Sequence, residues 1–236
     1  MARSSAKIER VRSNIEGLDP FVEGGIVKGS TNIVVGSSGS GKSIFAAQFL
    51  VGGLKKGEKC LYVNFEEKKE DFYNNMLEFG WDLKEYEIKG LFFYLEYAPV
   101  KVKGLLDEGG GMIESIILKN NISRLVFDNL ASFFSLFRNN ADKKEAYISL
   151  FNMIKSWKCT TVLTYEEELK DEKYSEPMGL ECDSVIALYY VMKDKERERF
   201  IEILKMRGTD HSNKMYKFEI KYSGISIGKK PSSFNK

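Results

Sequence analysis

The stretch NIVVGSSGSGKS, residues 32–43, decides the fold of this 236-residue chain. Its first part, residues 32–36, is a short run rich in β-branched residues that ends in glycine, which is typical of a buried strand. Its second part matches the pattern GxxxxGK[ST], and apolar residues at helical spacing continue to residue 55. A glycine-rich loop between a strand and a helix predicts a phosphate-binding loop.

The residue types in this loop suit phosphate chemistry. Glycines let the backbone curl so that successive N–H groups point at phosphate oxygens, and the helix N-terminus adds a partial positive charge. Lys42 is expected to reach the outer phosphates, and the Ser43 hydroxyl is expected to ligate Mg²⁺. The predicted nucleotide-binding residues are Gly36, Ser37, Ser38, Gly39, Ser40, Gly41, Lys42, Ser43 and Ile44.

A phosphate-binding loop needs a partner carboxylate on the metal side. The apolar strand predicted over residues 124–128 ends in Asp128. This aspartate is expected to hold Mg²⁺ through water or to polarise a Mg²⁺-bound water. The alternative is that Asp128 caps the turn that follows its strand.

Two further carboxylates, Glu66 and Glu67, follow the apolar strand predicted over residues 60–65. In a parallel sheet the carboxyl ends of the strands lie at one edge, where ligands bind. A carboxylate at that edge can orient an attacking water or accept its proton. The alternative is an acidic helix start stabilised by the helix dipole, and spacing alone leaves both interpretations open.

Strands alternate with helices as far as residue 165, which predicts an α/β fold with a mostly parallel central sheet. Antiparallel hairpins are expected over residues 184–228, after a turn-rich lead-in over residues 1–30. We expect one domain over residues 1–236. The charged run KDKERER at residues 193–199 is predicted to be an exposed hairpin connection. The remaining predicted strands cover residues 91–96, 160–165, 184–192, 199–205, 215–220 and 225–227, and the predicted helices cover residues 42–55, 67–78, 112–119 and 143–157.

Composition excludes several classes of protein. Lys and Arg exceed Asp and Glu by 36 − 34 = +2, so nothing points strongly to nucleic acid or an anionic membrane. Cys60, Cys159 and Cys182 have no CxxC spacing, and one histidine is too few for a His-based metal site. With no apolar run of ~18 residues and no secretory signal over residues 1–12, a cytoplasmic protein is expected.

Longer stretches resemble a known family over nearly the whole chain. They are the lead-in over residues 15–30, the segment VNFEE at residues 63–67, FGWDL at residues 79–83, and EILKMRGTDH at residues 202–211. These stretches are similar to the KaiC-like branch of the RecA superfamily of ATPases. The resemblance implies a RecA-like P-loop domain that binds and hydrolyses Mg-ATP slowly, with Glu66, assisted by Glu67, as the catalytic carboxylate.

The resemblance also implies a homo-oligomeric ring, commonly a hexamer, with ATP bound between subunits. Lys205, Arg207, Thr209 and His211 fall on the family's KxRGTxH segment, which reaches the nucleotide of the neighbouring subunit. Because residues i and i+2 share one face of a strand, Lys205 and Arg207 can aim at one γ-phosphate. His211 would lie near the ribose or the base. Without the resemblance, a solvated strand face and a surface turn are the simpler interpretations.

Three other functions stay open from the sequence. A RadA/RecA paralogue would bind single-stranded DNA, a scaffold or switch would bind nucleotide with weak hydrolysis, and a kinase would need an acceptor site. DNA-binding loops need basic residues and stacking aromatics. The loop over residues 166–178 has six acidic residues and two lysines, which disfavours DNA. The segment after Asp128, which contains Phe133, Phe134 and Phe137, is more compatible with DNA binding.

Overall fold

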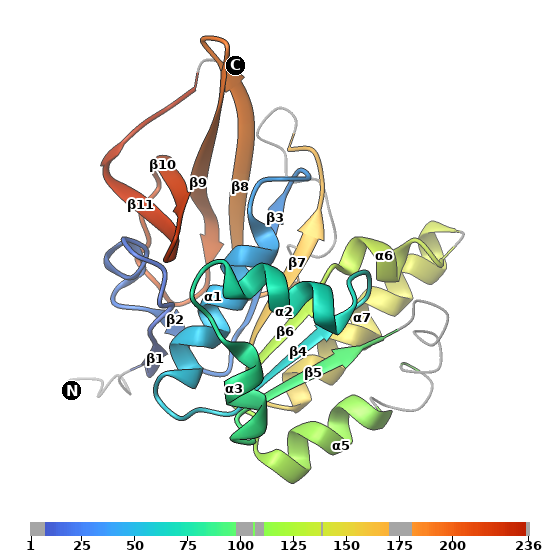
Figure 1. Ribbon diagram of the computed structural model, residues 1–236. Coiled ribbons are helices and arrows are strands. Elements are labelled where there is room, and N and C mark those ends of the chain that lie inside the picture. The colour runs from blue at the N-terminus through green and yellow to red at the C-terminus, as the bar shows by residue number, and fades with distance from the viewer. Residues whose placement is uncertain (1–7, 98–105, 107–110, 138, 170–180, 235–236) are drawn as a thin grey trace, which may run out of the picture.

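The computed structural model describes residues 8–97, 106, 111–137, 139–169 and 181–234. Its centre is a nine-stranded sheet in the order β11-β10-β9-β8-β3-β7-β6-β4-β5 (Figure 1). The strands from β8 to β5 in this order run parallel, and β9, β10 and β11 are antiparallel additions at one edge. The strands are β3 (Thr31–Gly36), β4 (Cys60–Asn64), β5 (Phe92–Glu96), β6 (Arg124–Asp128), β7 (Thr160–Glu166), β8 (Ser184–Lys193), β9 (Glu196–Met206), β10 (Tyr216–Lys221) and β11 (Gly224–Pro231).

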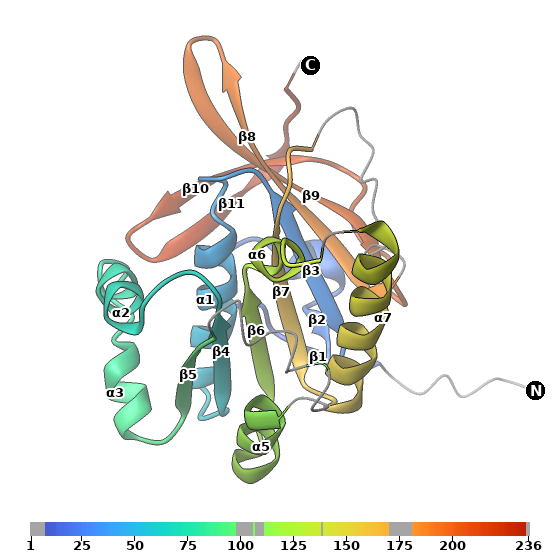
Figure 2. The ribbon, with the colours of Figure 1, turned by 90° about the vertical axis from the view of Figure 1, so that its right-hand side faces the viewer.

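Helices cover both faces of this sheet, with α1, α2 and α3 on one side and α7 on the other (Figure 2). The helices are α1 (Lys42–Leu54), α2 (Lys69–Leu77), α3 (Leu83–Ile88), α5 (Gly111–Asn120), α6 (Leu130–Phe134) and α7 (Asn140–Ser156). This architecture confirms the predicted fold class, a mostly parallel sheet flanked by helices with antiparallel hairpins at the C-terminal end.

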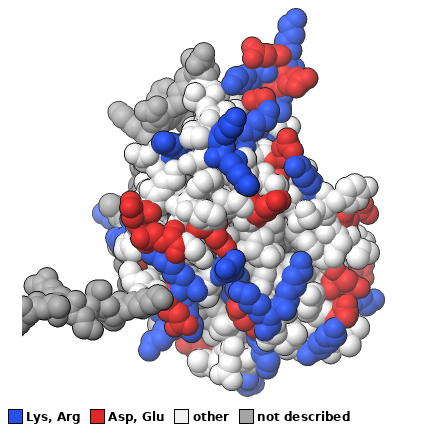
Figure 3. Space-filling model, turned by 90° about the vertical axis from the view of Figure 1, so that its left-hand side faces the viewer, with Lys and Arg blue, Asp and Glu red and all other residues white. Residues whose placement is uncertain are grey.

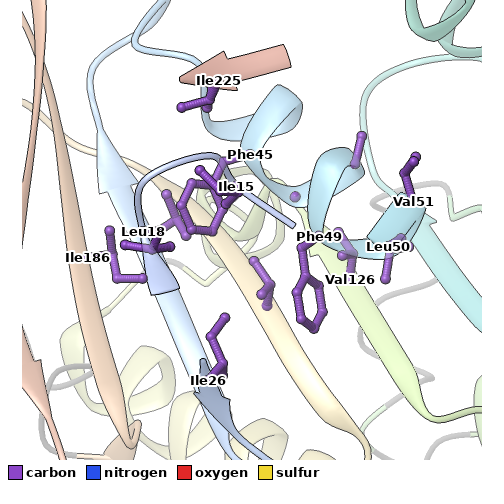
Figure 4. Close-up of a cluster of buried hydrophobic side chains, with 14 of the residues drawn as sticks. Ile15, Leu18, Ile26, Phe45, Phe49, Leu50, Val51, Val126, Ile186 and Ile225 are labelled. Carbon is purple, nitrogen blue, oxygen red and sulfur yellow. The ribbon is translucent and has the colours of Figure 1, made fainter. Parts of the chain in front are cut away.

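Two hydrophobic clusters hold the layers together. Along β3, Val34 belongs to the cluster under α1, whereas Ile33 and Val35 belong to the cluster under α7, as the two-residue period of a strand requires. Figure 4 shows Phe45 and Phe49 of α1 within the first cluster. Burial of each such ring contributes about 2–3 kcal/mol, so α1 and the loop before it are fixed on the sheet.

The lead-in segment is more ordered than the sequence predicts. Residues 1–30 were expected to be irregular, but β1 (Arg10–Val11) and β2 (Ile26–Val27) pair as a small antiparallel sheet. The buried Gln48 of α1 donates to the carbonyls of Asn14 and Ile225 and accepts from the Ile225 N–H. One side chain therefore joins the lead-in, α1 and β11.

Other differences from the prediction are local. The predicted strands and helices are present, but α3 and α6 were not predicted. The exposed hairpin predicted over residues 193–199 is present, but its connection is shorter than predicted, because β9 begins at Glu196 and pairs with β8 out to Lys193. Asp194 and Lys195 alone form the turn, and both have positive φ angles, 47° and 72°, as two-residue hairpins favour.

Two simple findings bear on the class of protein. Among the residues that the structure describes, no helix has the length and apolar character that crossing a bilayer requires. Cys60, Cys159 and Cys182 are buried thiols. Burial raises the pKa of both Cys159 and Cys182 to about 11, so these two thiols stay protonated near neutral pH.

Candidate functional site

Strand register brings the predicted site residues to one edge of the sheet. Gly36 of β3 lies opposite Glu166 of β7, and Asn64 of β4 lies opposite Asp128 of β6. A cleft of about 410 Å³ opens at this edge, a size suited to a small ligand. Its lining residues are Ser38, Gly39, Gly41, Lys42, Ser43, Ile44, Glu66, Asp128, Asn129, Glu166, Arg199 and Ile220.

The glycine-rich loop has the backbone geometry of an anion cradle. Gly39 and Gly41 have φ angles of 74° and 103°, in the left-handed region that favours glycine. Helix α1 begins immediately afterwards at Lys42, so its N-terminal dipole points into the cleft. The other loop residues support this shape, because Gly36 ends β3, the Ser40 N–H donates to Ser37 O at 3.2 Å, and Ser40 is buried.

Lys42 is the buried cation of the cleft. Its Nζ donates to the Ser37 carbonyl at 2.9 Å and lies 3.8 Å from a carboxylate oxygen of Glu166. Burial lowers the pKa of Lys42, and the carboxylates of Glu166, Asp128 and Glu66 oppose that decrease. An anion bound beside Lys42 would favour its charged form in the same way.

Asp128 is held in place by two hydroxyl groups. It is 5% exposed, accepts from the Tyr62 hydroxyl at 2.6 Å and also accepts from the Thr164 hydroxyl. Burial and the adjacent carboxylate raise the pKa of Tyr62 well above its ordinary value, so Tyr62 stays a donor. Neither partner could be predicted from the sequence, because the contacts depend on β6 lying between β4 and β7.

Asn129 connects two of the strand ends. Its side-chain oxygen caps α6 by accepting from the Ala131 N–H at 2.9 Å, and it also accepts from the Glu166 N–H at 3.3 Å. Asn129 and Glu166 both line the cleft, and the sequence analysis assigned neither to it. The Asn-x-x pattern of an N-cap before an apolar run was the available signal for α6.

Glu66 and Glu67 diverge, although they are adjacent in sequence. The Asn64 side-chain oxygen accepts from both of their N–H groups at 2.8 Å, which fixes this turn. The Glu66 carboxylate accepts from Ser132, and Glu66 lines both the phosphate-loop cleft and a neighbouring cleft of about 250 Å³. The Glu67 carboxylate accepts from Asn75 at 2.7 Å, and Glu67 lines the smaller of these two clefts but not the phosphate-loop cleft; burial raises the pKa of Glu67.

The oxygen atoms of this cleft suit Mg²⁺ that is bound together with phosphates. Ser43 and Asp128 offer a hydroxyl and a carboxylate, which are the hard ligands that Mg²⁺ prefers. Within the described residues, no group of three or more His, Cys, Asp or Glu side chains could hold a metal by itself. Magnesium commonly binds through one or two protein ligands, waters and substrate phosphates, so the donor set fits that mode.

Comparison with known proteins identifies the family of this chain. Residues 11–232 match the model of the ATPase family described as KaiC. The chain belongs to the KaiC family of ATPases. This confirms the resemblance stated from the sequence motifs, and it supports nucleotide binding as the role of the cleft.

Relatives of this KaiC-family chain include clock proteins and single-domain archaeal proteins. Circadian clock protein KaiC3 of Synechocystis is 34% identical over 225 residues, covering 90% of this chain but 44% of that protein. The UPF0273 protein PF1931 of Pyrococcus furiosus is 31% identical and is covered over 94% of its length. The crystal structure of KaiC-like protein PH0186 of Pyrococcus horikoshii has a TM-score of 0.84 and 32% identity, covering 94% of this chain and 99% of that one. The chain thus spans less than half of the clock protein KaiC3.

The KxRGTxH segment of this KaiC-family chain, residues 205–211, does not line the cleft of its own subunit. In the β8–β9 pair, Lys205 is opposite Val185 near the start of β8, whereas Leu188, later in β8, lies opposite Gly36. Lys205 Nζ donates to the Cys182 carbonyl at 2.7 Å, and burial lowers its pKa. Lys205 is therefore directed away from the phosphate loop of its own subunit.

Among the other residues of this segment, Thr209 contacts the lead-in, whereas Arg207 and His211 contact residues elsewhere in the chain. The Thr209 hydroxyl accepts from Arg10 at 2.9 Å, and Arg10 also forms an ion pair with Glu23. Arg207 lies 3.5 Å from an Asp183 carboxylate oxygen, and the His211 ring contacts the Ser212 carbonyl at 3.0 Å. The sequence marks Arg10 as one of several basic residues near the N-terminus, but nothing in the local pattern pairs it with Thr209, which is 199 residues away.

The structure describes only part of the acidic loop that disfavours DNA binding. Residues 166–169 are described, and the rest of the predicted loop, residues 170–178, lies outside the described residues. On the face shown in Figure 3, Lys and Arg side chains are interspersed with Asp and Glu, so this face offers no continuous basic surface. Phe133 and Phe134 of α6 are buried in the core rather than displayed for stacking.

Proposed function

We propose that this protein binds and hydrolyses Mg-ATP, with the nucleotide held between subunits of a homo-oligomeric ring. The observation that carries the proposal is the single cleft lined by Lys42, Glu66 and Asp128 beside the glycine-rich loop. Membership of the KaiC family of ATPases supports it. Lysine, metal-side carboxylate and water-orienting carboxylate are the groups that phosphoryl transfer to water requires.

Each residue has a distinct role in this proposal. Lys42 neutralises charge on the outer phosphates, and Ser43 and Asp128 hold the metal side of the site, Asp128 through water. Glu66 orients the attacking water and accepts its proton. Mg²⁺, when bound, offsets the charge that develops on the transferring phosphoryl group. Glu67 assists indirectly, since its carboxylate lines the neighbouring cleft.

The proposal extends to the assembly. Residues 1–236 would form one ATPase domain, with the lead-in over residues 1–30 and the strands over residues 184–228 as parts of it. Lys205, Arg207, Thr209 and His211 would complete the site of the next subunit, and the family suggests six subunits. A cytoplasmic location is part of the same proposal.

Steady-state hydrolysis of ATP by the wild-type protein tests the function. We expect turnover with Mg²⁺ and its loss with excess EDTA, because the donor set needs the metal to be bound with the phosphates. The assay is repeated at low salt with single-stranded DNA, since phosphate contacts weaken steeply as salt rises. Absence of Mg-dependent turnover contradicts the proposal, and strong stimulation by DNA favours the recombinase alternative.

Arg207→Ala tests the role in the neighbouring site. We expect kcat to fall about 10²-fold or more, because an arginine supplied in trans stabilises transition-state charge. Mixing Arg207→Ala with Lys42→Ala should restore activity, since a random 1:1 ring has roughly a quarter of its interfaces intact. Lys214→Ala, which removes a surface cation nearby, is the matched control. Wild-type turnover by Arg207→Ala in an intact ring contradicts the role in the neighbouring site. A mixture of the two variants that is no more active than either variant alone contradicts it as well.

A further inference from the structure

Arg199 of β9 is hydrogen-bonded to the phosphate loop of its own subunit. The Nε and Nη2 atoms of Arg199 donate to the Gly39 carbonyl at 3.1 and 3.0 Å. Both donors of one guanidinium edge thus meet a single carbonyl oxygen at the apex of the loop. Arg199 also lines the cleft that holds Lys42 and Asp128.

Tyr190 of β8 holds this arginine in place. The guanidinium carbon of Arg199 lies 4.2 Å from the centre of the Tyr190 ring, within the range of a cation–π contact. The same ring packs against the loop, because a Cβ atom added to Gly39 would lie 3.4 Å from it. Loop, arginine and ring therefore form one packed unit, here called the Arg199–Tyr190 clamp.

Arg197 provides a natural contrast on the same strand. It lies two residues before Arg199, which places it on the same face of β9. Its guanidinium is 5.2 Å from the centre of the Tyr190 ring, and it donates to the Tyr190 carbonyl at 3.4 Å. Arg197 lines the neighbouring pocket beside Ser37 and Ser38, whereas Arg199 lines the nucleotide cleft.

The direction of the Gly39 carbonyl decides what the loop offers an anion. In a planar trans peptide the C=O and the next N–H point in opposite directions, so holding the Gly39 carbonyl also fixes the Ser40 N–H, whose bond to the Ser37 carbonyl closes the turn of the loop. With its φ of 74°, glycine has the conformational freedom to rotate this peptide. A carbonyl turned into the loop would present partial negative charge where phosphate oxygens bind.

We propose that Arg199 is a positioning residue for the nucleotide, which holds the Gly39 peptide so that the phosphate loop is preorganised to accept the phosphates. The inference rests on the proposed ATP-binding function. Preorganisation raises affinity by removing the cost of ordering the loop on binding, without adding a contact to the reacting atoms. It predicts a change in nucleotide affinity and KM rather than in kcat.

The test measures binding of a fluorescent ADP analogue carrying an N-methylanthraniloyl group, in the presence of Mg²⁺, to the full-length protein. Arg199→Met is expected to weaken binding about tenfold and to raise KM for ATP similarly, with less than about a threefold change in kcat. Arg199→Lys keeps the charge but cannot donate two bonds along one planar edge, so about fivefold weakening should remain. Arg197→Met, which removes the same charge two residues away, should bind as the wild type does.

The outcomes separate this inference from the proposed function. Wild-type protein that fails to bind the probe removes the proposed function, whereas binding by the wild type and unchanged binding by Arg199→Met overturn the clamp. Full recovery in Arg199→Lys, or equal weakening in Arg197→Met, would assign the effect to charge alone and also overturn it. If Arg199→Met lowers kcat but leaves affinity and KM unchanged, the clamp is also overturned. If Arg199→Met does not fold, as judged by circular dichroism, the comparison of Arg199→Lys with Arg197→Met decides.

Discussion

Replacing Glu66 by Gln is expected to leave ATP bound but to lower kcat by about 10³-fold, the effect of removing a positioned general base. The amide keeps the size of the side chain and can still accept from Ser132, so the cleft keeps its shape. It cannot accept a proton from the attacking water. Single-turnover hydrolysis and nucleotide binding, measured on the same preparation, separate chemistry from affinity.

Two neighbouring carboxylates make this experiment specific. Glu67→Gln is expected to have a smaller effect, because the Glu67 carboxylate is bonded to Asn75 in the adjacent cleft. Glu96→Gln is the matched control, since Glu96 lines that adjacent cleft and not the phosphate-loop cleft. Normal hydrolysis by Glu66→Gln removes the base assignment, and an equal loss in Glu67→Gln would assign the role to the pair.

Replacing Lys42 by Ala is expected to weaken ATP binding by about 10²–10³-fold and to bring hydrolysis below detection. Lys42 is 7% exposed and faces the carboxylates of Glu166, Asp128 and Glu66. Without its ammonium group the triphosphate would enter a cleft lined by three carboxylates with one fewer cation. Titration with labelled ATP and a turnover assay measure the two losses.

Lys55→Ala is the control for this substitution, because Lys55 is an exposed lysine at the opposite end of α1. It should bind and hydrolyse ATP as the wild type does. Lys42→Arg keeps the charge but replaces a compact ammonium by a larger planar group, so partial binding with poor turnover is expected. Wild-type affinity in Lys42→Ala contradicts the placement of the phosphates beside this residue.

The parts of the site that are marked by a pattern of neighbouring residues could be predicted from the sequence. The glycine spacing before Lys42 and the apolar run that ends at Asp128 each need only neighbouring residues to be recognised. The fold class followed from the same kind of signal, because strands and helices alternate at spacings that a parallel sheet requires. The lead-in strands, two residues each, are too short to give a periodic signal.

Contacts that depend on strand order could not be predicted. Tyr62 and Thr164 reach Asp128 from the strands on either side of β6, and nothing in their local sequence marks them. Spacing also left Glu66 and Glu67 equivalent, whereas in the fold Glu66 lines the phosphate-loop cleft as well as the smaller cleft beside it, and Glu67 lines the smaller cleft but not the phosphate-loop cleft. Arg199 belongs to a run of alternating charges, and no local pattern tells which arginine of that run contacts the phosphate loop.

Strand β9 has a consequence for how the proposed ring would work. Arg199 holds the subunit's own phosphate loop, and Lys205, six residues later, lies ~20 Å further along the same strand. The strand is paired with β8 from Glu196 to Met206, with a register shift between Ile203 and Lys205, and with β10 beside Arg199, so a displacement at Arg199 is expected to reach Lys205 through the sheet. In a ring whose Lys205 and Arg207 serve the adjacent site, filling one site would be communicated mechanically to the next. Turnover would then be cooperative around the ring rather than independent in each subunit.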